Sequence, residues 1–255
     1  MQKLYRPPYV RVSGVLNKNI PIPLYYQLKE KLTQMIQNGE MPVGSLVPSE
    51  RELSERYGIS RMTVRQALGE LVKEGLLVRE QGKGTFVAEP KINQGLLKLT
   101  SFSEDMRSRG MEPDSRVKAI YVQEAPPMVA SALGLSSEKR VVIFERVRLA
   151  DNKPMALEIS HLPLAKFPEL DKEDLHSASL YKLLEDKYNV SIHHARQTIE
   201  VGLSSSVESK YLGIRSKSPV LLIERITFDA KDQPFEFVKS VYRGDRYKLQ
   251  VELYR

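Results

Sequence analysis

The segment SRMTVRQALGELVKEGLLVREQGKGTFV, residues 60–87, joins an amphipathic helical pattern to a glycine-rich hairpin pattern. Ser60 is a favourable N-cap for a helix that runs from Arg61 to Glu74, and Gly75 is a favourable stop. One stripe of this helix is apolar and comprises Val64, Ala67, Leu68 and Leu71. The pattern predicts that this stripe is buried and that the opposite face is free.

Two more helices are predicted before this segment, and a hairpin closes it. The first helix begins near Pro23, and the second begins at Ser49, where the Ser-x-x-Glu spacing is typical of a capping box. Gly58 ends the second helix two residues before Ser60, so the turn between the second and third helices is very tight. Two short strand-like runs then flank Gln81, Gly82, Lys83 and Gly84, which predicts a wing beside a helix-turn-helix.

The free face of the third helix carries side chains suited to DNA. A helix fits the major groove, where arginine bonds guanine and glutamine pairs with adenine. Hydroxyls at a helix N-terminus bind phosphate, and a glycine-rich tip lets the backbone enter a minor groove while a lysine meets phosphates. The candidate residues are Arg51, Ser60, Arg61, Thr63, Arg65, Gln66, Gly82, Lys83 and Gly84. A solvated helix face and an ordinary tight turn explain each feature taken alone, but their consecutive order favours a winged helix-turn-helix that binds double-stranded DNA.

Composition sets broad limits on the kind of protein. The formal net charge of +7 and the pI near 9.4 suit a polyanionic partner, although charge alone is weak evidence. The absence of cysteine excludes a disulfide, a thiolate nucleophile and a zinc finger. No apolar run approaches the roughly 20 residues that span a bilayer, and residues 1–18 lack the apolar run of a secretory signal. We therefore expect a soluble cytoplasmic protein that does not associate with a membrane.

The patterns divide the chain into four parts: an N-terminal arm (1–18), a DNA-binding domain (19–88), a linker (89–97) and a second domain (98–255). The second domain alternates short helices with strand-like runs, which indicates an α+β sheet. These runs are Arg116–Val122, Arg140–Leu149, Met155–His161, Ser191–Leu203, Val220–Phe228 and Phe235–Tyr242. The similar segments FERVRL (144–149) and IERITF (223–228) each precede a hairpin turn, which suggests an internal duplication of about 80 residues.

Several polar residues of the second domain suit an anion. Thr100, Ser101 and Ser103 stand at the start of a predicted helix, where they either cradle a phosphate or simply cap the helix. Arg146 and Arg148 share one strand face, so they either face solvent or need an anion or carboxylates inside the fold. Glu145 lies on the opposite face. Further polar candidates, each also explicable as a structural residue, are Ser179, Tyr181, Glu158, Glu236 and Tyr242.

Longer motifs resemble a known family. PIPLYYQLKEKLTQMI, PSERELSERYGISRMTVRQAL and EGLLVREQGKGTFV resemble the winged helix-turn-helix of GntR-superfamily transcription regulators. LTSFSEDMRSRGMEP, RVRLADNKPMALEISHLP, SLYKLL and FEFVKSVYRGDRY resemble the effector domain of the HutC branch, an antiparallel-sheet domain similar in fold to chorismate lyase. Within that branch the chain is most similar to repressors of N-acetylglucosamine utilisation. The resemblance leaves out the first 18 residues.

The resemblance implies a transcriptional repressor that a sugar 6-phosphate releases from its operator, without catalytic residues, metal or cofactor. Relatives surround the phosphate with positions that match Ser101, Phe102, Ser103, Arg146, Arg148, Ser179 and Tyr181, and hold the sugar with positions that match Glu158, Glu236 and Tyr242. All ten positions carry the expected residue type. The implied effector is glucosamine 6-phosphate or N-acetylglucosamine 6-phosphate. Because one helix reads only a few base pairs, we expect a homodimer on a palindromic operator.

The same residues allow three other interpretations. An enzyme that acts on a phosphorylated metabolite has Glu158 and Glu236 as acid or base, but no nucleophile-base pair or cofactor motif accompanies them. A constitutive DNA-binding protein would use its second domain only to dimerise. His193-His194 suggests a metal site, but neighbouring side chains of a strand point to opposite faces, and no well-spaced acidic partner is evident, so we expect no metal there.

Overall fold

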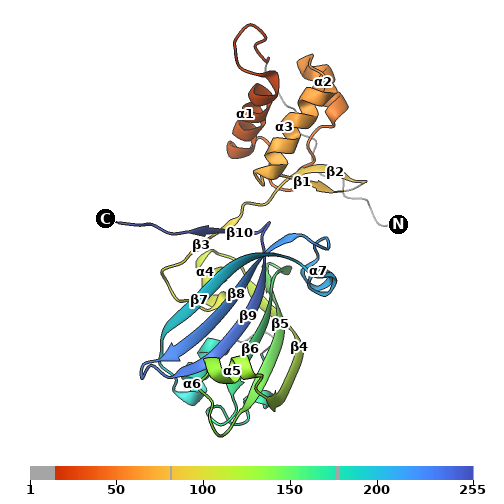
Figure 1. The fold of residues 1–255 in the computed structure, drawn as a ribbon. Coiled ribbons are helices and arrows are strands. Elements are labelled where there is room, and N and C mark those ends of the chain that lie inside the picture. The colour runs from red at the N-terminus through yellow and green to blue at the C-terminus, as the bar shows by residue number, and fades with distance from the viewer. Residues whose placement is uncertain (1–14, 81, 176–178, 255) are drawn as a thin grey trace. The chain divides into compact units, whose positions relative to one another are not determined.

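The structure, a computed structural model, describes residues 15–80, 82–175 and 179–254. It separates into two compact units, Met1–Lys91 and Ile92–Arg255. In the first unit, three helices pack beside a two-stranded antiparallel hairpin (Figure 1). Their bounds are α1 Leu24–Gln37, α2 Glu50–Tyr57, α3 Arg61–Lys73, β1 Leu77–Glu80 and β2 Gly84–Val87.

The core of the first unit lies between α1 and the apolar stripe of α3. Leu28 and Leu32 of α1 are fully buried with Leu53 of α2, and the predicted stripe of α3 is buried against them. Burial of each such side chain contributes about 1.5–3 kcal/mol to the free energy of unfolding. The predicted helix starts and stops are confirmed within one residue.

Local caps fix the tight turn between α2 and α3. Ser49 and Glu52 form the predicted capping box, and Ser60 caps α3 by accepting a hydrogen bond from the amide of Thr63 at 3.1 Å. Gly58 ends α2 in the left-handed region with φ of 59°, which glycine adopts without strain. The chain thereby reverses within two residues and presents α3 at a fixed angle to α2.

Part of the predicted N-terminal arm belongs to this unit. Leu16 is buried in the α1–α3 core, and the ammonium of Lys18 donates to the carbonyl of Gly58 at 2.8 Å. Leu16 and Lys18 therefore dock this part of the arm on the unit, whereas Val15 is 95% exposed. The rest of the predicted arm, residues 1–14, lies outside the described residues.

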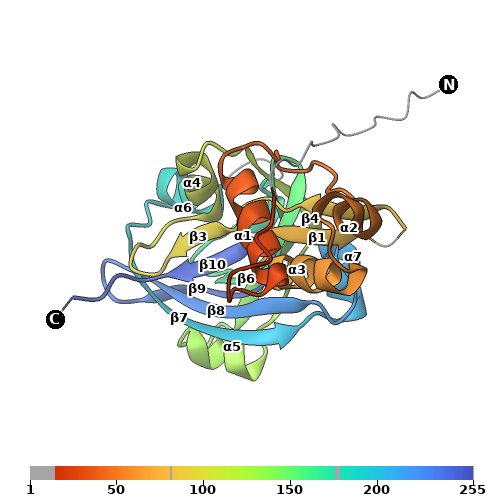
Figure 2. The ribbon, with the colours of Figure 1, turned by 90° about the horizontal axis from the view of Figure 1, so that it is seen from above.

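The second unit is built on a six-stranded antiparallel sheet with the order β4-β5-β6-β9-β8-β7. Figure 2 shows α4 and α6 on one side of this sheet and α5 on the other. The α+β prediction is confirmed, and each predicted strand matches an observed one, with only Ser191 of the predicted fourth strand falling outside β7. The strands are β4 Pro113–Glu124, β5 Arg140–Ala150, β6 Lys153–Pro163, β7 Ile192–Leu203, β8 Pro219–Asp229 and β9 Pro234–Arg243; the helices are α4 Phe102–Ser108, α5 Pro127–Ala132, η1 Leu170–Lys172, α6 Leu180–Tyr188 and α7 Ser206–Leu212.

The two faces of the sheet have different coverings, and this decides where a site can form. Alternate residues of β5 divide between them: Val142 and Phe144 pack with Leu180 and Leu184 of α6, whereas Val141 packs with α5. Because every second residue of a strand lies on the same face, Arg146 and Arg148 lie on the face that α6 covers, with Val142 and Phe144.

The predicted linker is partly a strand. Ile92–Gly95 forms β3, which pairs in parallel with β10, Tyr247–Gln250, at the C-terminal end of the same unit. The sequence predicts only a short, semi-extended linker here, because the partner strand of these residues lies far away in the chain. The polar composition of residues 89–97 gives no signal of such a distant pairing.

The internal duplication suggested by FERVRL and IERITF has a counterpart in the sheet register. The hairpins β5–β6 and β8–β9 each carry a register shift at matching places, between Arg148 and Leu149 and between Thr227 and Phe228. The hairpins meet through β6 and β9, which pair antiparallel. The sheet is thus two similar halves related across the β6–β9 pair, and Arg146 and Arg225 occupy equivalent positions in them.

Candidate DNA-binding surface and ligand cavity

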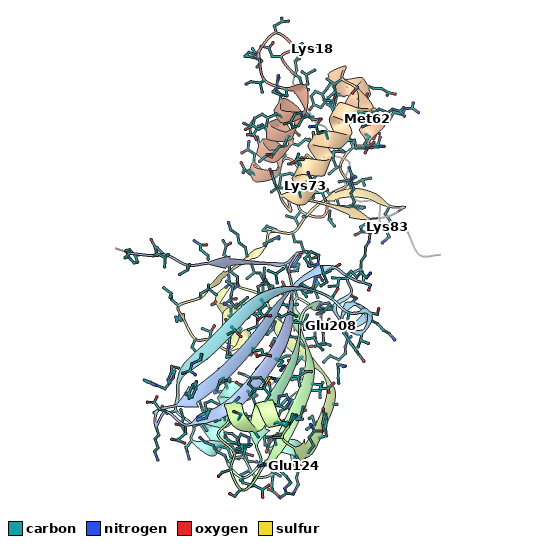
Figure 3. The ribbon with its side chains drawn as sticks, viewed as in Figure 1. Lys18, Met62, Lys73, Lys83, Glu124 and Glu208 are labelled. Carbon is teal, nitrogen blue, oxygen red and sulfur yellow. The ribbon has the colours of Figure 1, made fainter. Side chains whose placement is uncertain are left out.

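The outer face of α3 is open to solvent and polar, as the sequence predicts. Arg61, Met62, Arg65 and Gln66 are all exposed, with Met62 at 68%. In Figure 3 the side chain of Met62 projects outward from α3. At the start of the helix the hydroxyls of Ser60 and Thr63 lie 2.8 Å apart. This face is free for a major groove, while the buried stripe holds the helix on the unit.

The exposed side chain of Arg65 is held in place by an ion pair. Its Nε donates to both carboxylate oxygens of Glu50 at 3.1 Å, and its Nη2 donates to Oε2 at 2.9 Å. Arg79 of β1 places Nη2 3.7 Å from the other oxygen of the same carboxylate. A single acidic side chain of α2 therefore connects α3 with the wing. Glu50 has no signal of this role in the sequence, because its contacts join residues of separate elements.

The wing tip combines an exposed cation with a required glycine. Lys83 pairs with Glu80 at 3.0 Å and remains 74% exposed (Figure 3). Gly84 has φ of 128°, and a Cβ there would lie 2.8 Å from Cδ1 of Leu46. Gly82 also has positive φ, at 75°. An ordinary tight turn, which has no room for a side chain, therefore explains the glycine at Gly84. Lys83 remains the candidate phosphate contact. Arg51 is exposed as well and pairs with Glu55.

The second unit encloses a cavity of about 350 Å³ on the sheet face that α4 and α6 cover. Nine of the ten predicted ligand residues line it. They are Ser101, Phe102, Arg146, Arg148, Glu158, Ser179, Tyr181, Glu236 and Tyr242. The tenth, Ser103, is not on the wall, but its hydroxyl accepts a hydrogen bond from Nη2 of Arg148 at 3.1 Å. The fold thus brings together residues from three strands, β5, β6 and β9, and from the starts of two helices, α4 and α6.

Arg146 and Arg148 carry positive charge into this cavity. They are 2% and 3% exposed, so the alternative of a solvated face is wrong. Arg146 pairs with the carboxylate of Glu158, and the guanidinium of Arg148 lies over the ring of Phe102, 4.7 Å from its centroid. In both arginines Nε and Nη1 are buried without a hydrogen-bond partner among the described residues. Four unsatisfied cationic donors in one place indicate a binding site for an anion.

The ionisation of these groups follows from burial and mutual charge. Burial and the adjacent Arg146 lower the pKa of Arg148 to about 10, which leaves it charged near neutrality. Burial alone would raise the pKa of Glu158, but the two arginines hold it below its ordinary value. The two arginine cations therefore face the single carboxylate of Glu158. The remaining positive charge matches the negative charge of a phosphate group.

Ser101 and Ser179, at the starts of α4 and α6, both cap their helices. The hydroxyl of Ser101 accepts from the amide of Glu104 at 3.2 Å, and the Glu104 carboxylate accepts from the amide of Ser101. Ser179 caps α6 in the same way through the amide of Lys182. Ordinary capping is therefore the correct description of both serines in the absence of ligand. Their positions on the cavity wall still leave each hydroxyl proton available to an incoming acceptor.

A second polar group lies around Glu236. Its Oε2 accepts hydrogen bonds at 3.1 Å from both Tyr181 and Thr227. Burial, and then the charge of Glu158, raise the pKa of Glu236 above its ordinary value, and burial raises that of Tyr242 to about 12. These groups offer hydroxyl and carboxyl partners for a polyhydroxylated molecule.

Sequence reasoning missed Arg225 and Thr227, although both lie in IERITF. Arg225 lines the cavity and donates from Nε to the side-chain oxygen of Gln197 at 2.8 Å. The similarity of IERITF to FERVRL could have identified both residues, because it aligns Arg225 with Arg146.

The prediction that the side chains of His193 and His194 point to opposite faces of the strand is wrong. A register shift between Ile192 and His194 breaks the alternation of β7, and the two imidazoles lie edge to face with Nδ1 atoms 3.3 Å apart. Asp232 supplies the acidic partner from the β8–β9 turn, with Oδ1 3.6 Å from Nδ1 of His194.

A winged helix-turn-helix with an exposed recognition face, followed by a unit with a polar cavity, defines a transcription regulator with a small-molecule site. Comparison with known proteins agrees. Residues 24–87 match the family described as bacterial regulatory proteins, gntR family, and residues 108–248 match the UTRA domain. The chain belongs to the GntR family of bacterial transcription regulators, in its HutC branch. Among the described residues, no helix is long and apolar enough to cross a membrane.

Individual relatives extend this assignment. The chain is 47% identical to the HTH-type transcriptional repressor NagR of Bacillus subtilis, over 91% of this chain and 95% of that protein. It is 33% identical to the histidine utilization repressor of Pseudomonas putida, over 90% and 92%. The crystal structure of PhnF from Mycobacterium smegmatis superposes with a TM-score of 0.63 at 31% identity, over 89% of this chain and 98% of that one. The chain is a NagR-like regulator over nearly its whole length.

Proposed function

We propose that this protein is a homodimeric repressor of amino-sugar utilisation genes and that glucosamine 6-phosphate or N-acetylglucosamine 6-phosphate releases it from its operator. The observation that carries the proposal is the set of four guanidinium nitrogens on Arg146 and Arg148 that have no partner in the described part of the chain and are buried in a cavity with hydroxyl and carboxyl groups. The similarity to NagR over 95% of that protein supports the regulated pathway.

The phosphate binds at the arginine end of the cavity. A dianion there satisfies the unpartnered donors of Arg146 and Arg148, and charge-assisted hydrogen bonds are the stronger kind. Ser101 and Ser179, at the starts of α4 and α6, add hydroxyl donors. Hydroxyls of the sugar then meet Glu158, Glu236 and Tyr242, which line the same cavity.

The DNA-binding half reads the operator through α3. Arg61, Arg65 and Gln66 face the bases, and Lys83 of the wing faces phosphates. A two-fold dimer presents two α3 helices to successive major grooves, about 34 Å apart, so the operator is palindromic. The protein acts in the cytoplasm, where this DNA lies.

We infer that the cavity binds its ligand without transforming it. The carboxylate of Glu158 is engaged by Arg146, and that of Glu236 accepts from Tyr181 and Thr227, so both acids are held by protein partners. A sugar phosphate incubated with the protein should therefore be recovered unchanged.

Release of DNA by the effector is the decisive test. An operator is first selected from random-sequence duplexes with the full-length protein. Its affinity is then measured by fluorescence anisotropy with each amino-sugar 6-phosphate at millimolar concentration, with glucose 6-phosphate and with the unphosphorylated amino sugars. Only the amino-sugar phosphates should weaken DNA binding, and DNA should weaken their binding by the same factor because the two equilibria are linked. Unchanged operator affinity with both amino-sugar phosphates rejects the effector class.

A further inference from the structure

We propose that His193, His194 and Asp232 form a binding site for one divalent transition-metal ion, with zinc as the best match. The three residues offer two imidazole nitrogens and a carboxylate oxygen, all within 4.8 Å of one another. The site is separate from the arginine end of the cavity. It depends on neither the operator nor the effector proposed above.

Two of the three distances between ligand atoms are close to those of a tetrahedral metal site. Zinc binds imidazole nitrogen at about 2.0–2.1 Å, so two ligands of a tetrahedron are about 3.3 Å apart. The Nδ1 atoms of His193 and His194 are 3.3 Å apart, and Nδ1 of His194 is 3.6 Å from Oδ1 of Asp232. A proton shared between the two imidazoles explains the same short approach, and a metal ion would replace it without a large movement of either ring.

Rigid elements hold the two histidines. The extra residue in β7 opposite Phe228 turns neighbouring side chains toward each other, which a regular strand does not allow. The ring of His194 is stacked on Phe228, with centroids 4.6 Å apart and planes inclined by 3°. The orientation of this imidazole is therefore set by packing before any ion binds.

The turn that carries Asp232 is equally well defined. The carboxylate of Asp229 accepts from the amides of Lys231 and Gln233, and the amide of Ala230 donates to the carbonyl of Ser191 beside the histidines. Asp232 itself has φ of 57°. These bonds tie the β8–β9 turn to the start of β7, so an ion at the site would clip the two together.

The ligand set selects the class of metal. Imidazole nitrogens favour zinc, copper, nickel and cobalt, whereas magnesium and calcium prefer an all-oxygen shell. All three side chains are exposed, so an ion has direct access. Both histidines also line the ligand cavity, and a bound ion would therefore border it with a coordination position open to water or to a further ligand.

The test uses untagged full-length protein freed of metal with a chelator. Titration with zinc chloride, followed by calorimetry, should give one site per chain, and cobalt should give the visible absorption of a tetrahedral complex. Loss of a partner outside the coordination shell commonly weakens metal binding about 10–100-fold, so His193→Ala and His194→Ala should each weaken it at least about tenfold. Asp232→Asn should weaken it less, because two imidazoles remain.

Glu200→Gln, an exposed substitution on the same strand, is the matched control and should leave the affinity unchanged. The melting temperature in excess chelator checks that each variant folds like the parent protein. Absence of saturable zinc binding overturns the proposal. Equal affinity in the parent and both histidine variants also overturns it, since the ion then binds elsewhere.

Discussion

Glu50 holds Arg65 in a two-pronged ion pair, with Nη2 of the arginine 2.9 Å from Oε2 of the carboxylate. The same carboxylate lies 3.7 Å from Arg79 of the wing. An arginine held in this way is oriented before DNA arrives, because its fork-shaped guanidinium has few remaining rotamers. The acid also places negative charge beside the surface that meets phosphates. Both effects favour selective over indiscriminate DNA binding.

Glu50→Gln should therefore lower sequence preference and raise non-specific affinity. The substitution frees Arg65 and removes a charge that repels the DNA backbone. The measurement is the ratio of operator to random-duplex affinity by anisotropy over a range of salt concentrations. A ratio equal to that of the parent protein would show that Glu50 does not orient Arg65 for DNA.

Arg65→Ala and Lys83→Ala should weaken DNA binding in different ways. The first should lose about 1–3 kcal/mol for each base contact and relax sequence preference, whereas the second should weaken all duplexes evenly and reduce the salt slope by about one. Lys73→Ala, which removes a 74% exposed charge from the end of α3 (Figure 3), is the control and should have a smaller effect. Operator affinity and salt slope that stay at parent values in both variants contradict the assigned surface.

Arg146→Ala should give a repressor that binds its operator but does not respond to the effector. The change removes Nε and Nη1, which have no partner among the residues that the structure describes, and it lies outside the DNA-binding unit. Loss of a charged hydrogen bond of this kind costs about 1.5–3 kcal/mol, so the effector dissociation constant should rise about 10–150-fold. Arg140→Ala, an exposed change on the same strand, should remain inducible. A fully inducible Arg146→Ala protein would place the phosphate elsewhere.

Glu236→Gln should stabilise the ligand-free protein near neutral pH. The folded state raises the pKa of Glu236, so the stability that comes from its protonated form is present below the ordinary glutamate pKa and is lost as the pH rises through the folded value. A tenfold change in this ionisation constant corresponds to about 1.4 kcal/mol. The melting-temperature difference between variant and parent should grow with pH and vanish in acid, with exposed Glu124→Gln (Figure 3) showing no such trend.

Gly84→Ala should destabilise the DNA-binding unit through its wing. The added methyl group meets Leu46 at 2.8 Å on a backbone with φ of 128°, and overpacking of this kind costs about 1–3 kcal/mol. Gly69→Ala is the opposite control, because a Cβ there meets no atom within 4 Å and helix propensity should then gain about 0.5–1 kcal/mol. Chemical denaturation of both variants measures the difference. Equal stability would mean that the hairpin relaxes at no cost.

The features that sequence predicts well are those that depend on near neighbours. The cap at Ser60, the left-handed stop at Gly58 and the buried stripe of α3 are local, and all are as expected. The shared face of Arg146 and Arg148 follows from strand periodicity alone. The assignment of ligand residues rested on family resemblance, and the fold gathers nine of the ten around one cavity.

The features that sequence did not predict depend on contacts between distant segments. The pairing of Glu50 with Arg65 needs the angle between two helices, and the strand at residues 92–95 needs β10 as its partner. The side chains of His193 and His194 approach each other because a bulge in β7 shifts the register by one residue. The amino-acid composition of the strand gives no sign of this bulge. Periodicity assumes regular elements, so it fails where an element is irregular.

The pairing of β3 with β10 has a consequence for how the protein is made. Ile92, the first residue of the second unit, pairs with Tyr247 near the end of the chain. A ribosome delivers the whole DNA-binding unit before it makes β10, and domains generally fold as units during synthesis. The recognition helix is therefore assembled while the nascent chain is still growing, whereas the sensing half is completed only after β10 has been synthesised.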